Sequence, residues 1–232
     1  MGTEINLYQH QNDLLINSFD DIILKLMQKR VNNDKLKSLL FCGSEPGVGT
    51  TTITINMAIS LAQSKNRTLL VDSDMRKTAK SKRLSETPPL GLSDYLLAKA
   101  SVRDIINLTN IENLDYIASG TAHTQSARLF RLNTLDDLIS ALYNNYDFIL
   151  FDSPSLGVVN DASLLSILVD GIFLVGELGI TTKSSIKKMT VHFSQASDKL
   201  LGILVNKVDR SEYRMYMKNY DYFQKRRTLK DE

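Results

Sequence analysis

The sequence predicts an α/β fold built around a doubly wound, mostly parallel sheet that is flanked by helices. Short runs rich in Leu, Ile, Val and Phe recur along the chain, and stretches with helical spacing separate them. The runs are apolar at nearly every position, which is typical of strands covered on both faces in a parallel sheet. Strands that alternate with helices in this way indicate the doubly wound arrangement.

The alternating elements follow one another in a simple order. We expect strands at 36–42, 67–72, 112–118, 147–152, 171–176 and 199–206. We expect helices at 50–64, 132–145, 161–168 and 181–197. None of the apolar runs approaches the roughly 20 residues that a membrane-spanning helix needs.

The two ends of the chain stand outside this alternation. Residues 8–30 place Leu14, Phe19 and Leu26 at helical spacing, which predicts a helix that either packs on the sheet or binds a partner. Residues 210–232 hold seven Lys or Arg, four Asp or Glu and four Tyr, without a strand pattern. We therefore expect one domain over 1–209 and a tail over 210–232 that begins with a last helix.

The composition favours a protein of a reducing compartment. A formal net charge of +2 requires neither nucleic acid nor an anionic membrane as a partner. Cys42 is the only cysteine, so no internal disulfide can form, and its apolar surroundings predict that it is buried. The polar start of the chain predicts no signal peptide. We expect a cytoplasmic protein that reaches a membrane only through another molecule.

Residues 43–52, GSEPGVGTTT, resemble a phosphate-binding loop that lacks its lysine. The usual pattern is G-x-x-x-x-G-K-[ST], and we align Gly43, Gly49 and Thr51 with it. Thr50 stands where the lysine would reach the β- and γ-phosphates. A strand enters this turn and a helix leaves it, so backbone N–H groups and the helix N-terminus would face the phosphates. This context predicts a fold of the P-loop NTPase type, with the Thr51 hydroxyl on Mg²⁺.

Acidic residues follow two later strands. Asp72 and Asp74 come at the end of the strand 67–72, and Asp152 ends the strand 147–152. The carboxyl ends of parallel strands meet on the side of the phosphate loop, where these carboxylates would hold a hydrated Mg²⁺ and orient an acceptor. The alternative is that each aspartate is a helix cap or a turn former. Three of them after a phosphate loop favour the nucleotide site.

The order of several segments resembles one family. These segments are SEPGVGTTT, LLVDSDMRK, LGLSDYLL, YDFILFDSPS, DASLL and GILVNK. They are similar to the bacterial tyrosine kinases of capsular and exopolysaccharide assembly, which are related to the MinD and ParA positioning ATPases. Those ATPases carry an extra loop lysine where this chain has Glu45.

The resemblance implies a role for each motif. The residues that would cradle the nucleotide are Pro46, Gly47, Val48, Gly49, Thr50, Thr51, Thr52, Arg76 and Asn206, the last of them at the adenine. Asp72 and Asp74 would serve as acceptor base and metal organiser. Mg²⁺ would be held by Thr51, Asp72 and Asp152, and the implied cofactors are ATP or ADP with Mg²⁺.

The resemblance also implies a partner. Free-standing cytoplasmic members depend on a membrane adaptor of the polysaccharide co-polymerase type, which would bring this chain to the inner face of the cell membrane. No nucleic acid and no direct membrane insertion are implied. The C-terminal tyrosines resemble the phosphorylated cluster of the family: Tyr213, Tyr216, Tyr220 and Tyr222. Their spacing is equally typical of an apolar helix face.

Three departures from the family pattern bear on function. Thr50 replaces the loop lysine, which removes a fixed cation from the transferring phosphoryl group. The Glu-x-x-Arg-x-x-Arg motif that builds a ring of subunits corresponds to Asn17, Asp20 and Ile23, so we expect a monomer or dimer and no octameric ring. A proline-rich segment is replaced by HTQSARLF at 123–130, and Asp-Thr-Pro-Pro by DSPS at 152–155.

Three functions remain open from the sequence. The first is a tyrosine-kinase-like protein that binds Mg-nucleotide and phosphorylates its own tail weakly or not at all. The second is a pseudokinase that regulates polysaccharide assembly through its surfaces. The third is a positioning ATPase, which the absence of the extra loop lysine disfavours.

Overall fold

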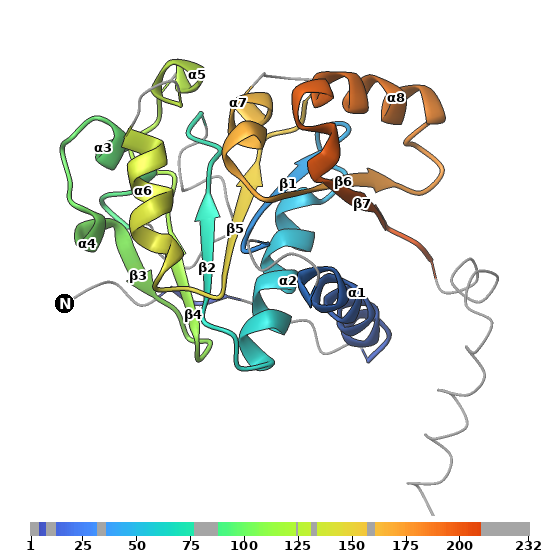
Figure 1. Cartoon of the computed structure of the whole chain (residues 1–232), viewed down its shortest axis with the longest axis horizontal. Coiled ribbons are helices and arrows are strands. Elements are labelled where there is room, and N and C mark those ends of the chain that lie inside the picture. The colour runs from blue at the N-terminus through green and yellow to red at the C-terminus, as the bar shows by residue number, and fades with distance from the viewer. Residues whose placement is uncertain are drawn as a thin grey trace, which may run out of the picture.

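In the computed structural model, the residues described are 5–7, 13–31, 36–76, 88–123, 125–130, 134–156 and 161–209. They form a seven-stranded sheet with helices on both faces (Figure 1). The strand order is β3-β4-β2-β5-β1-β6-β7, and β3 is the one strand that runs antiparallel to its neighbour. The predicted α/β fold with a doubly wound, mostly parallel sheet is confirmed.

The bounds of the elements are as follows. The strands are β1 (Ser38–Gly43), β2 (Thr68–Asp72), β3 (Ile106–Leu108), β4 (Leu114–Ile117), β5 (Phe148–Ser153), β6 (Gly171–Glu177) and β7 (Leu200–Asn206). The helices are α1 (Asp13–Val31), α2 (Thr50–Gln63), α3 (Leu92–Leu96), α4 (Val102–Ile105), α5 (Ser126–Leu129), α6 (Thr134–Tyr143), α7 (Asp161–Leu168), α8 (Lys183–His192) and the 3₁₀ helix η2 (Ser194–Lys199).

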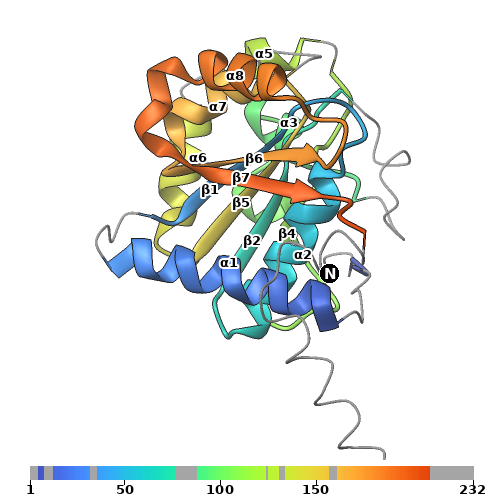
Figure 2. The ribbon, with the colours of Figure 1, turned by 90° about the vertical axis from the view of Figure 1, so that its right-hand side faces the viewer.

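The sheet separates two hydrophobic cores because successive side chains of a strand point to opposite faces. In β1, Leu39 and Phe41 pack with α1 and α2, whereas Leu40 and Cys42 pack with α6, α7 and α8. Figure 2 shows α1 and α8 on opposite sides of the sheet. All residues of β1, β2 and β5 are buried, as their continuous apolar runs predict.

β1 lies in the interior of the sheet, next to the central strand β5 and between it and β6. Ser38 is in register with Ile149 on one side, and Leu39 with Gly171 on the other. The phosphate loop that follows β1 is therefore anchored to the middle of the sheet, with the carboxyl ends of β2 and β5 beside it.

Two of the strands depart from the sequence prediction. β7 was expected to be covered on both faces, but it is an edge strand in which Ile203 is 43% exposed and Val205 is 52% exposed. β3 was not predicted, since three residues give too short a pattern. The predicted helix 181–197 is divided, because α8 ends at His192 and Phe193 leads into η2.

The predicted N-terminal helix is α1, which packs on the sheet. Its side chains Phe19, Ile23 and Leu26 are buried against α2. Ahead of it, Ile5 forms a parallel bridge with Thr109 at the edge of the sheet, and its amide donates to the carbonyl oxygen of Leu108 at 2.9 Å. This packing favours the core role of α1 over the alternative of a partner-binding helix.

Two further expectations concern membranes and the tail. No helix among the described residues is long and apolar enough to cross a membrane. Residues 210–232 lie outside the described residues, so the boundary at residue 209 stays a prediction.

Candidate functional site

The phosphate loop has the backbone conformation that its glycines predict. Gly47 and Gly49 have φ values of 86° and 89°, which are left-handed and favour glycine. Gly49 is also the N-cap of α2, so the amides of the first turn of α2 begin directly after it. Amides at the start of a helix lack acceptors within the helix and form a ready anion site. The loop therefore fits a phosphate group through its backbone.

The first position of the loop pattern is Ser44, and our alignment of Gly43 with it is wrong. The pattern has four residues between its two glycines, and counting back from Gly49 ends at Ser44. The Ser44 hydroxyl pairs with that of Thr181 at 2.9 Å. Gly43 matters for a different reason, since a Cβ there would lie 2.4 Å from Oγ1 of Thr50. The Thr50 side chain therefore packs over Gly43, where there is no side chain to obstruct it.

Two side chains from outside the loop hold it in place. Asn206 at the end of β7 donates from Nδ2 to the carbonyl oxygen of Val48 at 2.8 Å. The Ser185 hydroxyl in the first turn of α8 donates to Glu45 at 3.2 Å. A Cβ at Gly49 would come within 2.3 Å of the Asn206 side-chain amide, so the Asn206 side chain can occupy this position only beside a glycine. The adenine contact of Asn206 stays a prediction.

Asp72 and Asp152 lie side by side at the carboxyl ends of β2 and β5. They are register partners in neighbouring parallel strands, so their side chains share one face. That face carries α2, because Leu70 and Leu150, two residues earlier, pack with α2. Asp72 is 4% exposed and Asp152 is 7% exposed. The strand ends thus bring two nearly buried carboxylates to the loop side of the sheet.

The neighbours of Asp72 fix its carboxylate in place. The amide of Asp74 donates to Oδ1 of Asp72 at 3.0 Å, and Asp74 is itself buried. The Tyr116 hydroxyl from β4 donates to Oδ2 of Asp72 at 3.5 Å. Burial raises the pKa of Tyr116 well above its usual range, and the nearby charge of Asp72 adds to this. Tyr116 therefore keeps its proton and is a hydrogen-bond donor to Asp72, which the sequence did not predict because residues 112–118 have only the pattern of an ordinary strand.

The oxygen atoms at this edge suit Mg²⁺ bound together with phosphates. Among the described residues, no three His, Cys, Asp or Glu side chains gather closely enough to hold a metal by themselves. Mg²⁺ in nucleotide sites is usually bound through one or two carboxylates, with phosphate oxygens and waters completing the shell. Asp72 and Asp152 are carboxylates of that kind at this edge, and the metal-binding roles of Thr51, Asp72 and Asp152 stay predictions.

Arg76 joins three segments at the same end of the sheet. Its Nε donates to the Ser126 hydroxyl at 2.9 Å and lies 3.5 Å from Oδ2 of Asp161. Ser126 also donates to Asp161. α5 and α7, which supply these partners, lie at the end of the sheet where β2 and β5 finish (Figure 1). The sequence offered no signal for this contact, because the three residues are far apart along the chain.

The segment GLSDYLL has a structural role. A Cβ at Gly91 would lie 2.3 Å from the carbonyl oxygen of Ala118 and 2.4 Å from the amide nitrogen of Gly120. Asp94 accepts hydrogen bonds from the amides of Gly91 and Thr121. These contacts close α3 onto the loop that follows β4.

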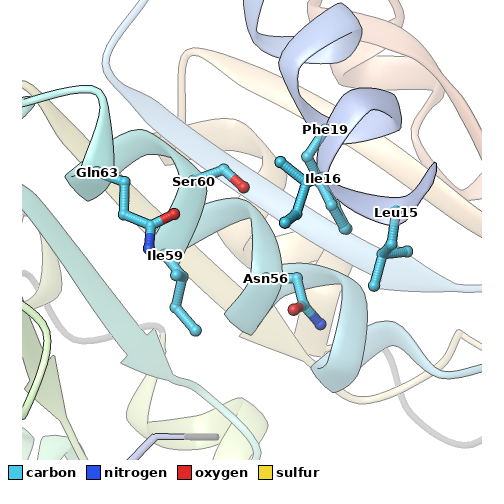
Figure 3. Close-up of a pocket in the computed structure, with 7 residues that line it drawn as sticks. All are labelled: Leu15, Ile16, Phe19, Asn56, Ile59, Ser60 and Gln63. Carbon is cyan, nitrogen blue, oxygen red and sulfur yellow. The ribbon is translucent and has the colours of Figure 1, made fainter. Parts of the chain in front are cut away.

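A shallow groove lies away from the loop, between α1 and α2. It is lined by Leu15, Ile16 and Phe19 of α1 and by Asn56, Ile59, Ser60 and Gln63 of α2 (Figure 3). Its lining contains no charged side chain, so it does not fit a nucleotide. The ring-motif positions lie on the same helix, and of these Asp20 is exposed whereas Ile23 is only 7% exposed.

The predicted phosphoacceptors Tyr213, Tyr216, Tyr220 and Tyr222 lie outside the described residues. The same holds for Lys77, which follows Arg76.

Comparison with known proteins gives this arrangement a family. A sequence family described as an AAA domain matches residues 37–212. The tyrosine-protein kinase CpsD of Streptococcus agalactiae is 33% identical over 176 residues, which cover 75% of this chain and 77% of that protein. The chain belongs to the bacterial tyrosine-protein kinases, a P-loop NTPase family.

Solved structures agree with this assignment. The chimerical protein CapA2B2 has a TM-score of 0.77 and 29% identity, over 84% of this chain and 85% of that one. The septum site-determining protein MinD from Pyrococcus horikoshii, complexed with Mg-ADP, has a TM-score of 0.62 and 25% identity, over 76% of this chain and 72% of that one. The resemblance inferred from the sequence motifs is confirmed at the level of family and fold.

Proposed function

We propose that this protein binds ATP or ADP with Mg²⁺ in its phosphate loop and acts as a cytoplasmic tyrosine-kinase-like component of capsular or exopolysaccharide biosynthesis. The observation that carries the proposal is the pairing of Asp72 with Asp152 in register, on the face of the sheet where the glycine loop opens α2. Backbone amides for phosphates and carboxylates for a metal thus stand at one edge of the sheet.

Each part of the site has a role in the proposed reaction. The amides around Gly47 and Gly49 bind the phosphates, and Pro46, Val48 and Thr52 complete the loop. Thr51, Asp72 and Asp152 would hold Mg²⁺, which would neutralise charge on the phosphates. Asp72, assisted by Asp74, accepts the proton of the attacking tyrosine hydroxyl as that oxygen bonds to the γ-phosphorus. ADP leaves with the electron pair of the broken bond.

Thr50 limits the rate of this reaction. The loss of one preorganised charge or donor costs about 10²–10³ in rate, or roughly 3–4 kcal/mol. Nucleotide binding depends on the backbone amides as well, so we expect it to suffer less. Phosphorylation of Tyr213, Tyr216, Tyr220 and Tyr222 is therefore weak in this proposal.

The proposed partner is a membrane adaptor of the polysaccharide co-polymerase type, which recruits the chain to the inner face of the membrane. Ile23 faces the core and is unsuited to a ring contact, which supports a monomer or dimer. Sedimentation velocity tests this assembly state, and an octamer-sized species would contradict it.

A pseudokinase is the second candidate, and Tyr116 favours it. A carboxylate that already accepts a hydrogen bond is a weaker acceptor for a substrate proton, and Tyr116 donates to Asp72. In this case the protein acts through its surfaces and transfers no phosphate. A positioning ATPase is the third candidate, supported by the likeness to MinD. ATP-dependent dimerisation on DNA or liposomes would favour it.

The deciding experiment is calorimetric titration of the natural chain and of Thr50→Lys with MgADP and MgATP. We expect both to bind, and Thr50→Lys to bind more tightly. Phosphorylation of the tail in the presence of the adaptor then separates the kinase from the pseudokinase. If neither chain binds nucleotide, the proposed function is wrong.

A further inference from the structure

One edge of the sheet is formed by a strand that lacks the usual protection against pairing. Among the described residues, β7 has a neighbouring strand on one side only, and Figure 2 views the molecule from this edge. Charged residues and proline commonly protect an edge strand, and β7 has neither. Its register shift against β6 lies at its start, so the run from Gly202 to Asn206 is regular. This run is open to pairing with another strand.

The backbone groups that face outward from β7 belong to Ile203 and Val205. Leu178, after β6, donates its amide to the carbonyl oxygen of Asn206 at 3.1 Å, so Asn206 directs its backbone groups toward β6. Backbone groups alternate in direction along a strand, so those of Leu204 also face β6. Ile203 and Val205 therefore direct their N–H and C=O groups to the outside of the sheet.

The side chains of the same two residues form apolar surface beside this edge. Ile203 is 43% exposed and Val205 is 52% exposed. Their register partners are Leu174 and Gly176, so both side chains lie on the face of the sheet where Leu174 packs in the core with α8. A strand added at this edge would bury part of this apolar surface, which favours pairing in addition to the backbone hydrogen bonds.

The regular run of β7 is complementary to itself. In an antiparallel copy with its two-fold axis at Leu204, Ile203 lies opposite Val205 of the second copy, and Val205 opposite Ile203. Both are hydrogen-bonded pairs, which exchange their N–H and C=O groups. Gly202 then lies opposite Asn206 of the second copy, and no atom lies within 4 Å of a Cβ added at Gly202. The glycine leaves room for the asparagine side chain.

Charges at the two ends of the run agree with this register. Lys199 precedes β7 and Asp209 follows it, so the two-fold axis sets the lysine of one copy opposite the aspartate of the other. Asp209 is exposed, and the Lys199 ammonium is anchored by the carbonyl oxygens of Ser166 and Ile167 at the end of α7. Opposite charges favour the antiparallel copy over a parallel one, in which like charges would meet.

We propose that β7 is an interface between two copies of this chain, paired antiparallel about Leu204 so that their sheets form one continuous sheet. The inference goes beyond the proposed function and specifies the dimer that it leaves open. The run from Gly202 to Asn206 is short compared with a standard interface of about 20–30 residues a side, so we expect a weak dimer with a micromolar dissociation constant. Asn206 also donates to Val48, so the paired strands connect the two phosphate loops.

Sedimentation equilibrium of the full chain measures this association. We expect the apparent mass to rise from that of a monomer toward that of a dimer between about 1 and 100 µM. In Ile203→Lys/Val205→Lys, lysine faces lysine in both hydrogen-bonded pairs, so the dissociation constant should rise at least about tenfold. The acidic variant Ile203→Glu/Val205→Glu should be weakened in the same way. A mixture of the two variants should form a dimer again, because each lysine then faces a glutamate.

Leu108→Lys is the matched control. Leu108 is 64% exposed on β3, at the opposite edge of the sheet, so a charge there should leave the dissociation constant unchanged. Thermal melting of each variant confirms that it is folded. Dimer formation in the mixture gives a second proof of folding for the two variants of β7.

Single cysteines test the register. Leu204→Cys places two cysteines at the axis, in a non-hydrogen-bonded pair whose Cα atoms are about 4.5 Å apart, which is within disulfide range. Ile203→Cys faces Val205 of the second copy, and the two cysteines are diagonal neighbours about 7–8 Å apart, which is too far. We expect mild oxidation to link Leu204→Cys at least about ten times faster than Ile203→Cys.

Several outcomes would overturn the proposal. One is a chain that stays monomeric up to about 1 mM. Others are a dimer that Ile203→Lys/Val205→Lys does not weaken, or one that Ile203→Cys links faster than Leu204→Cys. Hydrogen exchange at the amides of Ile203 and Val205 identifies what covers β7. Protection that rises with protein concentration supports a second copy, whereas protection independent of concentration shows that residues of the same chain cover the strand.

Discussion

The phosphate loop and helix α1 both lack cations that the resemblance to the tyrosine kinases implies, with different structural results. In the loop, the shape depends on Gly47, Gly49 and the amide of Asn206, and none of these involves the side chain of Thr50. In α1, Ile23 stands at a position that resembles an arginine of the ring motif, and it has become part of the core. At position 50 the loop keeps its shape, so we expect that a lysine can be introduced there. At position 23 the isoleucine is part of the hydrophobic core, so we expect that an arginine cannot.

Ile23→Arg gives the largest effect that this comparison predicts. A charge at a position that is 7% exposed has no partner in an apolar core, so we expect the free energy of unfolding to fall by about 3–5 kcal/mol. Chemical denaturation measures this. The matched control is Asp20→Arg on the exposed face of the same helix, which should change stability by no more than about 0.5 kcal/mol. Equal stability of the two variants would contradict the assignment of α1 to the core.

The reactivity of the Cys42 thiol reports whether the end of β1, just before the loop, stays buried although the loop has no lysine. Burial raises the pKa of its thiol from 9.0 to about 12, which lowers the thiolate population near neutral pH about a thousandfold. Alkylation of the folded chain at pH 8 should be slower than that of the denatured chain by at least this order. Rapid labelling would show that the loop region opens.

The same thiol gives a pH dependence with a defined sign. The native thiol keeps its proton up to about pH 12, whereas the unfolded chain releases it from about pH 9. Its contribution to stability is therefore complete below pH 9 and declines between pH 9 and 12. Cys42→Ala should reduce this part of the alkaline loss, as measured by denaturation at several pH values.

Gly49→Ala tests the claim that glycine conformation sets the loop. The residue has a φ of 89°, and an alanine in this region costs about 1–2 kcal/mol before its clash with Asn206 is counted. Gly202→Ala is the control, because nothing lies within 4 Å of a Cβ there. We expect thermal melting to separate the two variants, and similar melting temperatures would show that the loop tolerates another backbone shape.

Thr50→Lys should have the smallest effect on stability. Position 50 is half-buried beside Gly43, so we expect a change within about 0.5 kcal/mol, even though nucleotide affinity rises. Denaturation without nucleotide makes this measurement. A loss comparable to that of Ile23→Arg would show that the two regions do not differ.

The sequence predicted the parts of the fold that depend on local patterns. The central strands were recognised because burial on both faces makes them apolar at every position, and the loop because its glycines have fixed spacing. β3 and α5 were missed, since elements of three or four residues leave no periodicity. β7 looked like a covered strand because Ile203 and Val205 are as apolar as core residues, and sequence alone does not tell an edge strand from a central one.

Contacts between distant residues were the other limit. Asp72 and Asp152 could be predicted to meet, because parallel strands align their carboxyl ends. The Ser126–Asp161–Arg76 contact and the Tyr116–Asp72 hydrogen bond could not, because they depend on which side chains happen to face one another after folding.

The interior place of β1 has a consequence for folding during synthesis. Ser38 pairs with Ile149 and Leu39 with Gly171, so the strand that carries the loop has neither neighbouring strand until β5 and β6 have been synthesised. Helix α2, which follows β1 directly, can cover Leu39 and Phe41 earlier, but the strand pairings of β1 form only after the later strands are made. The phosphate loop is thus translated before both of the strands that pair with β1.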